Sequence, residues 1–177
     1  MKQLFFAMLL GILLSQSIAA QTNASVDEVI KSSFGGVSAV EPKQLILTQE
    51  QFSQVQNRAK TAVRTKVYRY YDIRGEAKRL GVAVLIAREV RSKKATVLYA
   101  FEPNGTLRFT EIMAFGEPPE YIPGKTWMTQ LQNKEPSALL TVGKDIPTVS
   151  GSTLSARCVT EGARIARAIY EITLKKQ

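Results

Sequence analysis

A short run of small and hydroxyl-bearing residues stands where the sequence changes from loop to helix. The first turn of a helix presents backbone N–H groups that lack intrahelical partners, and the helix dipole places partial positive charge there. A glycine-hydroxyl turn that leads into such an end is a suitable seat for a phosphate group. Serine and threonine are also common helix N-caps, so ordinary capping explains the same pattern. The residues concerned are Ser150, Gly151, Ser152, Thr153, Leu154 and Ser155.

The composition excludes several kinds of catalytic and metal site. The chain has 177 residues, no histidine and one cysteine, Cys158. Without histidine there is no Ser–His or Cys–His nucleophile pair. One cysteine forms no internal disulfide and no cysteine cage for zinc or an iron–sulfur cluster. Redox or group-transfer chemistry would therefore use a bound organic cofactor or carboxylates, and we expect no metal ligands and no catalytic residues of the chain's own.

The element that must position the hydroxyl turn is a long amphipathic helix over residues 154–174. Its positively charged end, Lys175 and Lys176, suits a helix C-terminus. Arg157 is expected on the exposed side, and Cys158 is expected to be buried and unreactive. The apolar face comprises Leu154, Cys158, Ala163 (or Gly162), Ile165, Ile169 and Ile172.

Upstream patterns predict an α+β fold, with a mainly antiparallel sheet packed by an N-terminal amphipathic helix and the long C-terminal helix. Thr48 and Gln51 form a capping box that opens a helix over 49–64. A short helix is expected near 127–131. Residues 21–47 are expected to be a lead-in segment, with a short helix at 26–31. The predicted strands, joined by short turns, cover 67–73, 81–90, 95–101 and 107–115.

The first 20 residues have the pattern of a secretory signal peptide. Lys2 precedes an apolar run over 4–14, and Ala19 and Ala20 offer small residues for cleavage. The run is short for a membrane span, which needs about 20 apolar residues, although retention as an anchor remains open. We therefore expect an exported protein of the periplasm or cell envelope.

The chain is basic, with a formal net charge of +9. Basic residues outnumber acidic ones most strongly over residues 61–110. Solvated strand and turn positions explain this block, and so does a docking face for an acidic partner or an anionic membrane. Export argues against nucleic acid as the partner. Binding to an anionic polymer outside the cell is a further alternative, which rests on charge alone.

The segment Val149-Ser-Gly-Ser-Thr-Leu-Ser155 resembles the SGATxS motif of the FMN-binding domain family. That family includes the flavin-carrying subunits of the Rnf and sodium-translocating NADH:quinone reductase complexes. The order and spacing of the hairpin at 95–115 and of the stretches at 111–134 and 149–171 are also similar to small exported members. The resemblance covers roughly residues 80–172.

The resemblance implies an exported electron-transfer flavoprotein whose FMN-binding domain spans residues 48–177. In the family, a flavin transferase outside the cytoplasm esterifies the last hydroxyl of the motif, here Thr153, with the FMN phosphate. The surrounding turn would hold the phosphate, while Glu117 with its proline-rich loop, Tyr121 and Trp127 are candidates to contact the flavin ring. Core packing is the alternative for Trp127. The implied partners are the transferase and an acidic redox partner or a membrane electron-transfer complex.

Two positions depart from the family pattern. The family usually has aspartate three residues before the motif serine, where this chain has Pro147, and the nearest acid is Asp145. The family's alanine is Ser152 here. Because the transferase recognises both positions, non-covalent FMN and a cofactor-free structural or binding module of the same fold remain open alternatives.

Overall fold

The computed structural model describes residues 25–176. Its core element is a five-stranded sheet in which every neighbouring pair is antiparallel and the strand order follows the sequence. The predicted α+β fold with an antiparallel sheet is therefore confirmed. The strands are β1 (Ala39–Ile46), β2 (Val67–Arg74), β3 (Arg79–Glu89), β4 (Lys94–Phe101) and β5 (Leu107–Phe115).

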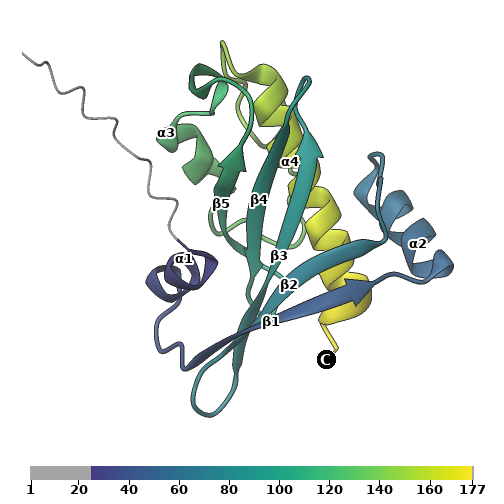
Figure 1. The fold of residues 1–177 in the computed structure, drawn as a ribbon, viewed down its shortest axis with the longest axis vertical. Helices are drawn as coiled ribbons and strands as arrows, with labels where there is room; N and C mark the ends of the chain where they lie inside the picture. Colours follow the sequence, from purple (N-terminus) through teal and green to yellow (C-terminus); the bar gives the residue numbers. More distant parts are fainter. Residues whose placement is uncertain (1–24, 177) are drawn as a thin grey trace, which may run out of the picture.

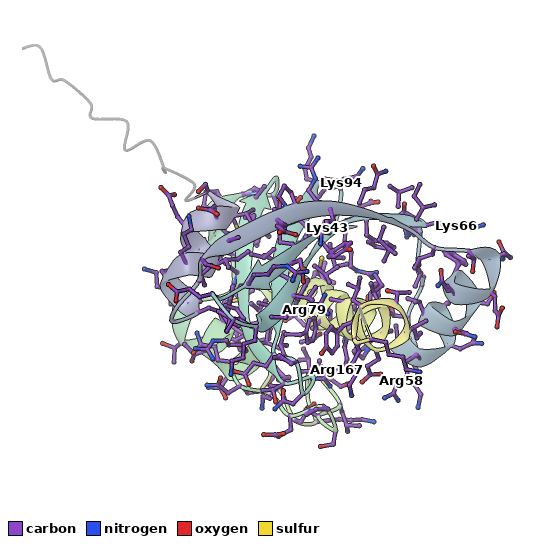
Figure 2. The ribbon with its side chains drawn as sticks, turned by 90° about the horizontal axis from the view of Figure 1, so that it is seen from below. Lys43, Arg58, Lys66, Arg79, Lys94 and Arg167 are labelled. Atoms are coloured by element: carbon purple, nitrogen blue, oxygen red, sulfur yellow. The ribbon has the colours of Figure 1, made fainter. Side chains whose placement is uncertain are left out.

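The principal helices lie on the two faces of this sheet (Figure 1). The helical elements are α1 (Val26–Ser33), α2 (Gln49–Ala59), α3 (Lys125–Met128) and α4 (Thr153–Ile169), with 3₁₀ turns at Pro119–Tyr121 and Thr129–Leu131. A π-helical turn at Tyr170–Leu174 continues α4. Seen from below, α4 and α2 lie side by side under the arched sheet, and α1 lies near its opposite end (Figure 2).

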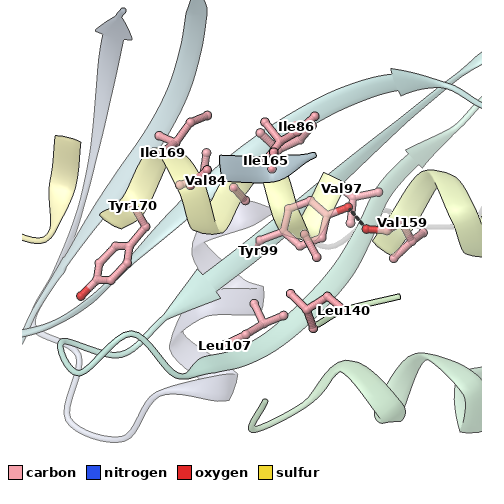
Figure 3. Close-up of a cluster of buried hydrophobic side chains, with 14 of the residues drawn as sticks. Val84, Ile86, Val97, Tyr99, Leu107, Leu140, Val159, Ile165, Ile169 and Tyr170 are labelled. Carbon is pink, nitrogen blue, oxygen red and sulfur yellow. Dashed lines mark hydrogen bonds between the residues drawn. The ribbon is translucent and has the colours of Figure 1, made fainter. Parts of the chain in front are cut away.

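Strand alternation sends every second side chain toward α4. Tyr70, Val84 and Tyr99 occupy cross-strand positions on this face, and all three are buried. The Tyr99 hydroxyl donates to the carbonyl of Val159 over 2.8 Å, so the main core is pinned to α4 by a buried hydrogen bond (Figure 3). Gly162 permits this close approach, because a Cβ there would lie 2.3 Å from the Tyr99 hydroxyl oxygen.

The opposite face of the sheet carries a smaller core under α1. Ile30 and Phe34 of this helix are buried against alternating residues of the strands. The rings of Phe34 and Phe109 meet edge to face, with centroids 6.0 Å apart. Burial on both faces is what makes the central strands β3 and β4 nearly continuous runs of apolar residues.

The segment expected to be a lead-in contributes both a helix and a strand. The short helix predicted at 26–31 is present as α1, but the strand β1 was not predicted. Its sequence AVEPKQLI alternates only between half-buried and exposed positions, which gives a weak apolar signal. Pro42 in its middle is tolerated because β1 is an edge strand.

The predicted helix over 49–64 ends early. The capping box is confirmed: Thr48 Oγ1 accepts from the amide of Gln51 at 3.1 Å, and Gln51 accepts from the amide of Thr48 at 3.0 Å. The helix stops at Ala59 because Lys60 is left-handed, with φ 50°, and turns the chain toward β2. Val63, expected on the helix, still reaches the core from the following loop.

Candidate functional site

The hydroxyl turn lies where the sequence places it, at the start of α4. Helix α4 begins at Thr153, one residue before the predicted start, and Gly151 has a positive φ of 79°. Glycine adopts this backbone conformation without the steric cost that a side chain would add. The Thr153 hydroxyl is exposed and donates to the carbonyl of Val149 over 2.9 Å. The turn therefore presents this hydroxyl at the molecular surface.

The N-terminus of α4 is uncapped. No side chain of the described region accepts a capping hydrogen bond there, and the first turn contains no acidic residue. The first backbone bond runs from the amide of Ala156 to the carbonyl of Ser152, at 2.9 Å. Within residues 25–176, the amides of Thr153, Leu154 and Ser155 donate to no acceptor, so three N–H groups remain for a ligand or solvent.

The other long helices show that this feature is particular to α4. Helices α1 and α2 both begin with a complete capping box and carry an acidic residue in the first turn. The ordinary explanation of the hydroxyl turn, that its serines or threonine cap the helix, is therefore wrong for this structure. The remaining motif residues divide by exposure: Ser150 and Gly151 are exposed, Ser152 and Ser155 are buried, and Leu154 is 43% exposed. The exposure of Leu154 also corrects its expected place on the buried face.

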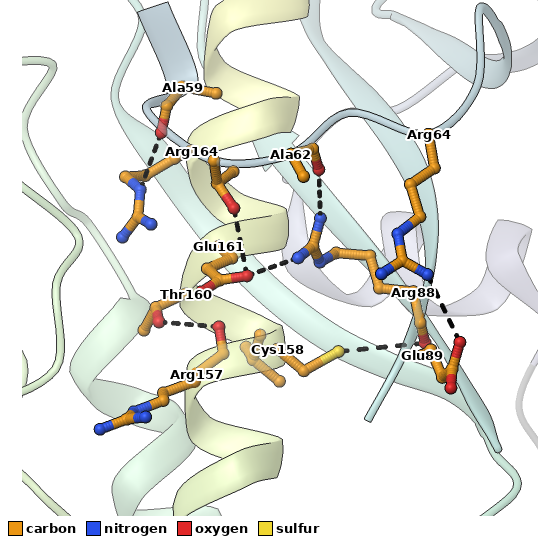
Figure 4. Close-up of polar contacts among 12 residues, drawn as sticks. Ala59, Ala62, Arg64, Arg88, Glu89, Arg157, Cys158, Thr160, Glu161 and Arg164 are labelled. Atoms are coloured by element: carbon orange, nitrogen blue, oxygen red, sulfur yellow. Dashed lines mark hydrogen bonds and ion pairs between the residues drawn. The ribbon is translucent and has the colours of Figure 1, made fainter. Parts of the chain in front are cut away.

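A basic turn lies at the same end of the molecule as the start of α4 (Figure 1). Cys158 Sγ lies 4.0 Å from the carbonyl of Arg88 near the end of β3, and Arg88 forms an ion pair with Glu161 (Figure 4). Since α4 runs antiparallel to β3, its first turn lies beside the β3–β4 turn that follows Glu89. That turn contains Arg91 and Lys93, and Lys94 follows as the first residue of β4; all three are exposed.

Cys158 is buried, as expected. It is 6% exposed, and burial raises the pKa of its thiol above the ordinary value. Because the thiolate is the reactive form, a raised pKa disfavours reaction of this side chain at neutral pH.

Glu117 has a structural role in the basic turn. Its Oε1 accepts from three consecutive backbone amides, those of Arg91, Ser92 and Lys93, at 3.1, 2.7 and 2.7 Å. These hydrogen bonds, led by those from Lys93 and Ser92, lower the pKa of the Glu117 carboxyl. The proline-rich segment is thereby tied to the β3–β4 turn, and Glu117 is 8% exposed.

Trp127 is packed in the main core and is only 7% exposed. Its Nε1 donates to the carbonyl of Pro147 over 2.8 Å, which anchors the loop that leads into the hydroxyl turn. Its surroundings thus agree with the alternative expectation, that Trp127 packs in the core. Tyr121 is half-buried, and the guanidinium of Arg91 lies 4.1 Å from the centre of its ring.

Asp145, the acid nearest the motif in the sequence, is committed to another turn. Its carboxylate accepts from the amides of Leu140 and Thr141, each at 2.8 Å. It therefore does not replace the aspartate that the resemblance would place at position 147.

Two arginines of α4 that the sequence did not single out hold the loop before the motif. Arg164 donates to the carbonyls of Ala59 and Leu140 at 3.0 and 3.1 Å. Arg167 donates to the carbonyl of Ala138 at 2.6 Å and is 7% exposed. Their spacing of three residues indicates that both lie on one side of a helix. It does not indicate their acceptors, because these are backbone carbonyls, which no sequence pattern identifies.

A cavity of about 570 Å³ lies elsewhere, against β1 and β2. None of the predicted cofactor-binding residues lines it. Its walls are Pro42, Lys43, Gln44, Val67, Tyr68 and Arg69.

No protein-family model matches the chain, and no curated protein matches it at a significant level. Among the helices of residues 25–176, none has the length and apolar content needed to cross a membrane. The same described part contains no cluster of three or more Cys, Asp or Glu side chains arranged to hold a metal ion. The predicted signal peptide, residues 1–20, lies outside the described residues.

Proposed function

We propose that this chain is an exported flavoprotein that carries FMN, with the FMN phosphate at the start of α4, and that it transfers electrons. The observation that carries the proposal is the uncapped first turn of α4, where three amides without acceptors stand beside the exposed Thr153 hydroxyl. A phosphate dianion would satisfy these donors and interact favourably with the helix dipole. The resemblance of residues 149–155 to the FMN-binding motif supports the same ligand.

The residues at this turn fit a phosphate held in either of two ways. For non-covalent binding, the amides of Thr153, Leu154 and Ser155 would donate to phosphate oxygens, and the Thr153 hydroxyl would turn from Val149 to donate as well. For a phosphoester, Thr153 Oγ1 would become the bridging oxygen and would give up its hydrogen bond to Val149. Gly151 leaves open space here, because a Cβ built on it meets no atom within 4 Å.

The bound FMN would supply the redox chemistry, and the chain would orient it and control access to it. Tyr121 and the loop after Glu117 lie beside the basic turn and offer a rigid surface for the flavin ring. Trp127 would act indirectly: its hydrogen bond to Pro147 would hold the residues that precede the motif in place. Arg91, stacked on Tyr121, would add positive charge next to the ring.

The test is to produce the full-length chain in a bacterial host with and without a co-expressed flavin transferase. We expect yellow protein that keeps its visible flavin absorption after denaturation, and an intact mass increased by one FMN moiety. Thr153→Ala should abolish the mass increase. Thr148→Ala is the matched control, because Thr148 is an exposed threonine of the same segment outside the motif.

The other outcomes separate the alternatives. Colour that is lost on denaturation, with no added mass, indicates non-covalent FMN at the same turn and requires that Thr153→Ala or Leu154→Glu weaken binding. Protein that remains colourless with the transferase and with added FMN contradicts the proposal and leaves a cofactor-free binding module.

A further inference from the structure

The end of the molecule that holds the start of α4 carries cations that form no ion pair with a described carboxylate. We call this surface the basic end and define it by Arg91 and Lys93 of the β3–β4 turn, Lys94 at the start of β4 and Arg157 of α4. All four are exposed, and none forms an ion pair with a described carboxylate. Lys94 projects into solvent on the side of the sheet away from α4 (Figure 2), so the basic end extends around the edge of the β3–β4 hairpin. The basic charge of this turn is therefore available to an outside partner.

The acidic residues nearest this surface do not neutralise it. Glu117 is buried under the turn, with its Oε1 engaged by three amides. Glu89 pairs with Arg64 at 3.5 Å. With Glu117 included, the basic end keeps a net positive charge, and unlike charges attract over about 8 Å at physiological ionic strength.

The basic end also has a small apolar centre. Leu154 is 43% exposed and lies one turn before Arg157 on the solvent side of α4. An apolar centre within a charged rim is the usual arrangement of a protein docking surface. Binding to a membrane requires a larger apolar face to enter the lipid, and Leu154 is the one large apolar residue exposed in the first turn of α4.

We infer that the basic end is the docking surface for an acidic electron-transfer protein, which exchanges electrons with the flavin held beside it. This inference rests on the proposed function. Oxidation of one reduced FMN releases two electrons and two protons, and an acidic partner with a one-electron centre would take the electrons singly, in two encounters. Such encounters are brief and use small interfaces, in which charge complementarity mainly raises the association rate.

The first test locates the surface and needs no flavin. Poly-L-glutamate is titrated into ¹⁵N-labelled protein at low ionic strength, and amide shifts are followed by NMR. We expect the largest shifts at residues 90–94 and 153–157, and loss of binding when salt is added. The double variant Lys93→Glu, Lys94→Glu should bind at least about tenfold more weakly.

The matched control is Lys175→Glu, Lys176→Glu, which makes the same charge change at the far end of the chain. Both lysine pairs are exposed. Each variant should lower the thermal midpoint slightly, because the control removes positive charge from a helix C-terminus and Lys94→Glu places a carboxylate opposite Glu89. Binding is therefore compared at a temperature at which both variants are fully folded. If the two variants weaken binding equally, or if the shifts lie elsewhere, net charge rather than the basic end attracts the probe and the inference fails. Binding to phosphatidylglycerol vesicles at physiological salt, with no binding of poly-L-glutamate, would also overturn it in favour of a membrane.

The second test uses flavin-loaded protein reduced by dithionite. Two ferricyanide ions oxidise each reduced flavin and become ferrocyanide, while two protons are released. Substitution of Lys93 and Lys94 by glutamate should slow this reaction about tenfold and should speed oxidation by cationic hexaammineruthenium(III). The control variant should leave both rates unchanged.

Flavin absorbance in the same samples distinguishes the two kinds of failure. Protein without flavin contradicts the proposed function. Protein with a full complement of flavin, whose rates with both acceptors are insensitive to Lys93 and Lys94, contradicts the docking surface alone.

Discussion

Single side chains at the motif end of the molecule have roles that depend on what they contact. Glu117 shows this most clearly, because one carboxylate oxygen accepts three successive amides of a turn more than 20 residues earlier in the chain. Three consecutive N–H groups that converge on one point form an anion-binding concavity. Here the chain supplies its own anion, and this contact joins the proline-rich segment to the sheet.

Glu117→Gln should lower the thermal midpoint by a few degrees at neutral pH, since a neutral amide accepts these hydrogen bonds less strongly. The pKa of Glu117 is lowered by folding, so its contribution is present above the ordinary glutamate pKa and is lost as pH falls through the lowered value. The difference between variant and wild type should therefore shrink in acid. Thermal melts at several pH values check this.

The control for Glu117 is Glu120→Gln, at an exposed residue of the same segment. It should leave the midpoint unchanged across the same pH range. Equal effects of the two substitutions would show that Glu117 contributes only its charge, and not its three hydrogen bonds.

At the scale of elements, the first turn of α4 is built differently from those of α1 and α2. A helix end that lacks both a cap and an acidic residue is less stable than one that has either. Leu154→Glu would place a carboxylate in that first turn, where it should raise helix stability by about 0.3–1 kcal/mol. The same charge should repel a phosphate.

The predicted result for Leu154→Glu is thus a pair of opposite effects: a slightly higher thermal midpoint of the flavin-free protein and weaker FMN binding. Urea denaturation and flavin titration measure the two. Leu139→Glu makes the same change at an exposed leucine outside any helix, and it should alter neither quantity. Unchanged FMN affinity in Leu154→Glu would show that the phosphate lies elsewhere.

Gly162 in α4 offers a second test at this scale. Alanine is normally the better helix residue by about 1 kcal/mol, but a Cβ here would lie 2.3 Å from the Tyr99 hydroxyl and 3.0 Å from its ring carbon. Gly162→Ala should therefore destabilise the fold by about 1–3 kcal/mol through overpacking. Chemical denaturation checks the sign.

Gly124→Ala is the comparison, because a Cβ at Gly124 meets no atom within 4 Å. It should cost little. A stabilised Gly162→Ala protein would mean that Tyr99 is able to move away without loss of its bond to Val159.

Periodicity predicted most of the elements because burial is what creates periodicity. Strands β2 to β5 begin and end within two residues of their predicted positions, and the long helix begins one residue early. Strand β1 was not predicted, because an edge strand that contains Pro42 buries too few side chains to show an alternation of apolar and polar residues. The end of α2 was not predicted, because the left-handed residue that ends it is Lys60 and not glycine, the residue that usually indicates such an end.

The site was predictable only in part for a related reason. The hydroxyl turn and its position at a helix start could be inferred from residue types. Whether those hydroxyls cap the helix could not, since the same residues suit both arrangements and only the backbone geometry decides. The anchoring of Glu117 joins residues 24 to 26 positions apart and follows from tertiary structure alone.

For the molecule as a whole, Asp72 is the main ionic link between strands. It is 2% exposed and receives Lys43 of β1 at 3.3 Å, Arg74 of β2 at 2.7 Å and Arg79 of β3 at 2.5 Å. Arg79 also donates to the carbonyl of Leu174 over 2.7 Å, so the cluster extends to the end of the C-terminal helix. Figure 2 labels Lys43 and Arg79 within this part of the structure.

Burial works to raise the pKa of Asp72, but hydrogen bonds from Arg79 and Lys43 outweigh burial and hold it below the ordinary value. The ion cluster therefore stabilises the protein at neutral pH, and this contribution is lost as pH falls through the lowered pKa. Asp72→Asn should cost about 2 kcal/mol, mainly because Arg79, the least exposed of the three cations, loses its counterion. Lys43 and Arg74 are partly exposed and keep Glu41, so they add little. Urea denaturation at neutral pH measures this.

Glu41→Gln is the matched control, since Glu41 contacts Lys43 and Arg74 at the surface and is 45% exposed. Its loss should cost about 0–1 kcal/mol. Equal losses for the two variants would contradict a buried hub.

The strand order has a kinetic consequence. Because each strand pairs with its sequence neighbour, the sheet can assemble from local hairpins, whereas α4 follows residue 150 and must return to pack on β3 and β4. Topologies of this kind close their longest loop late. The first turn of α4 comes to lie beside the β3–β4 turn only after that closure. A ligand that contacts both turns would therefore bind the folded domain and not the incomplete chain during synthesis.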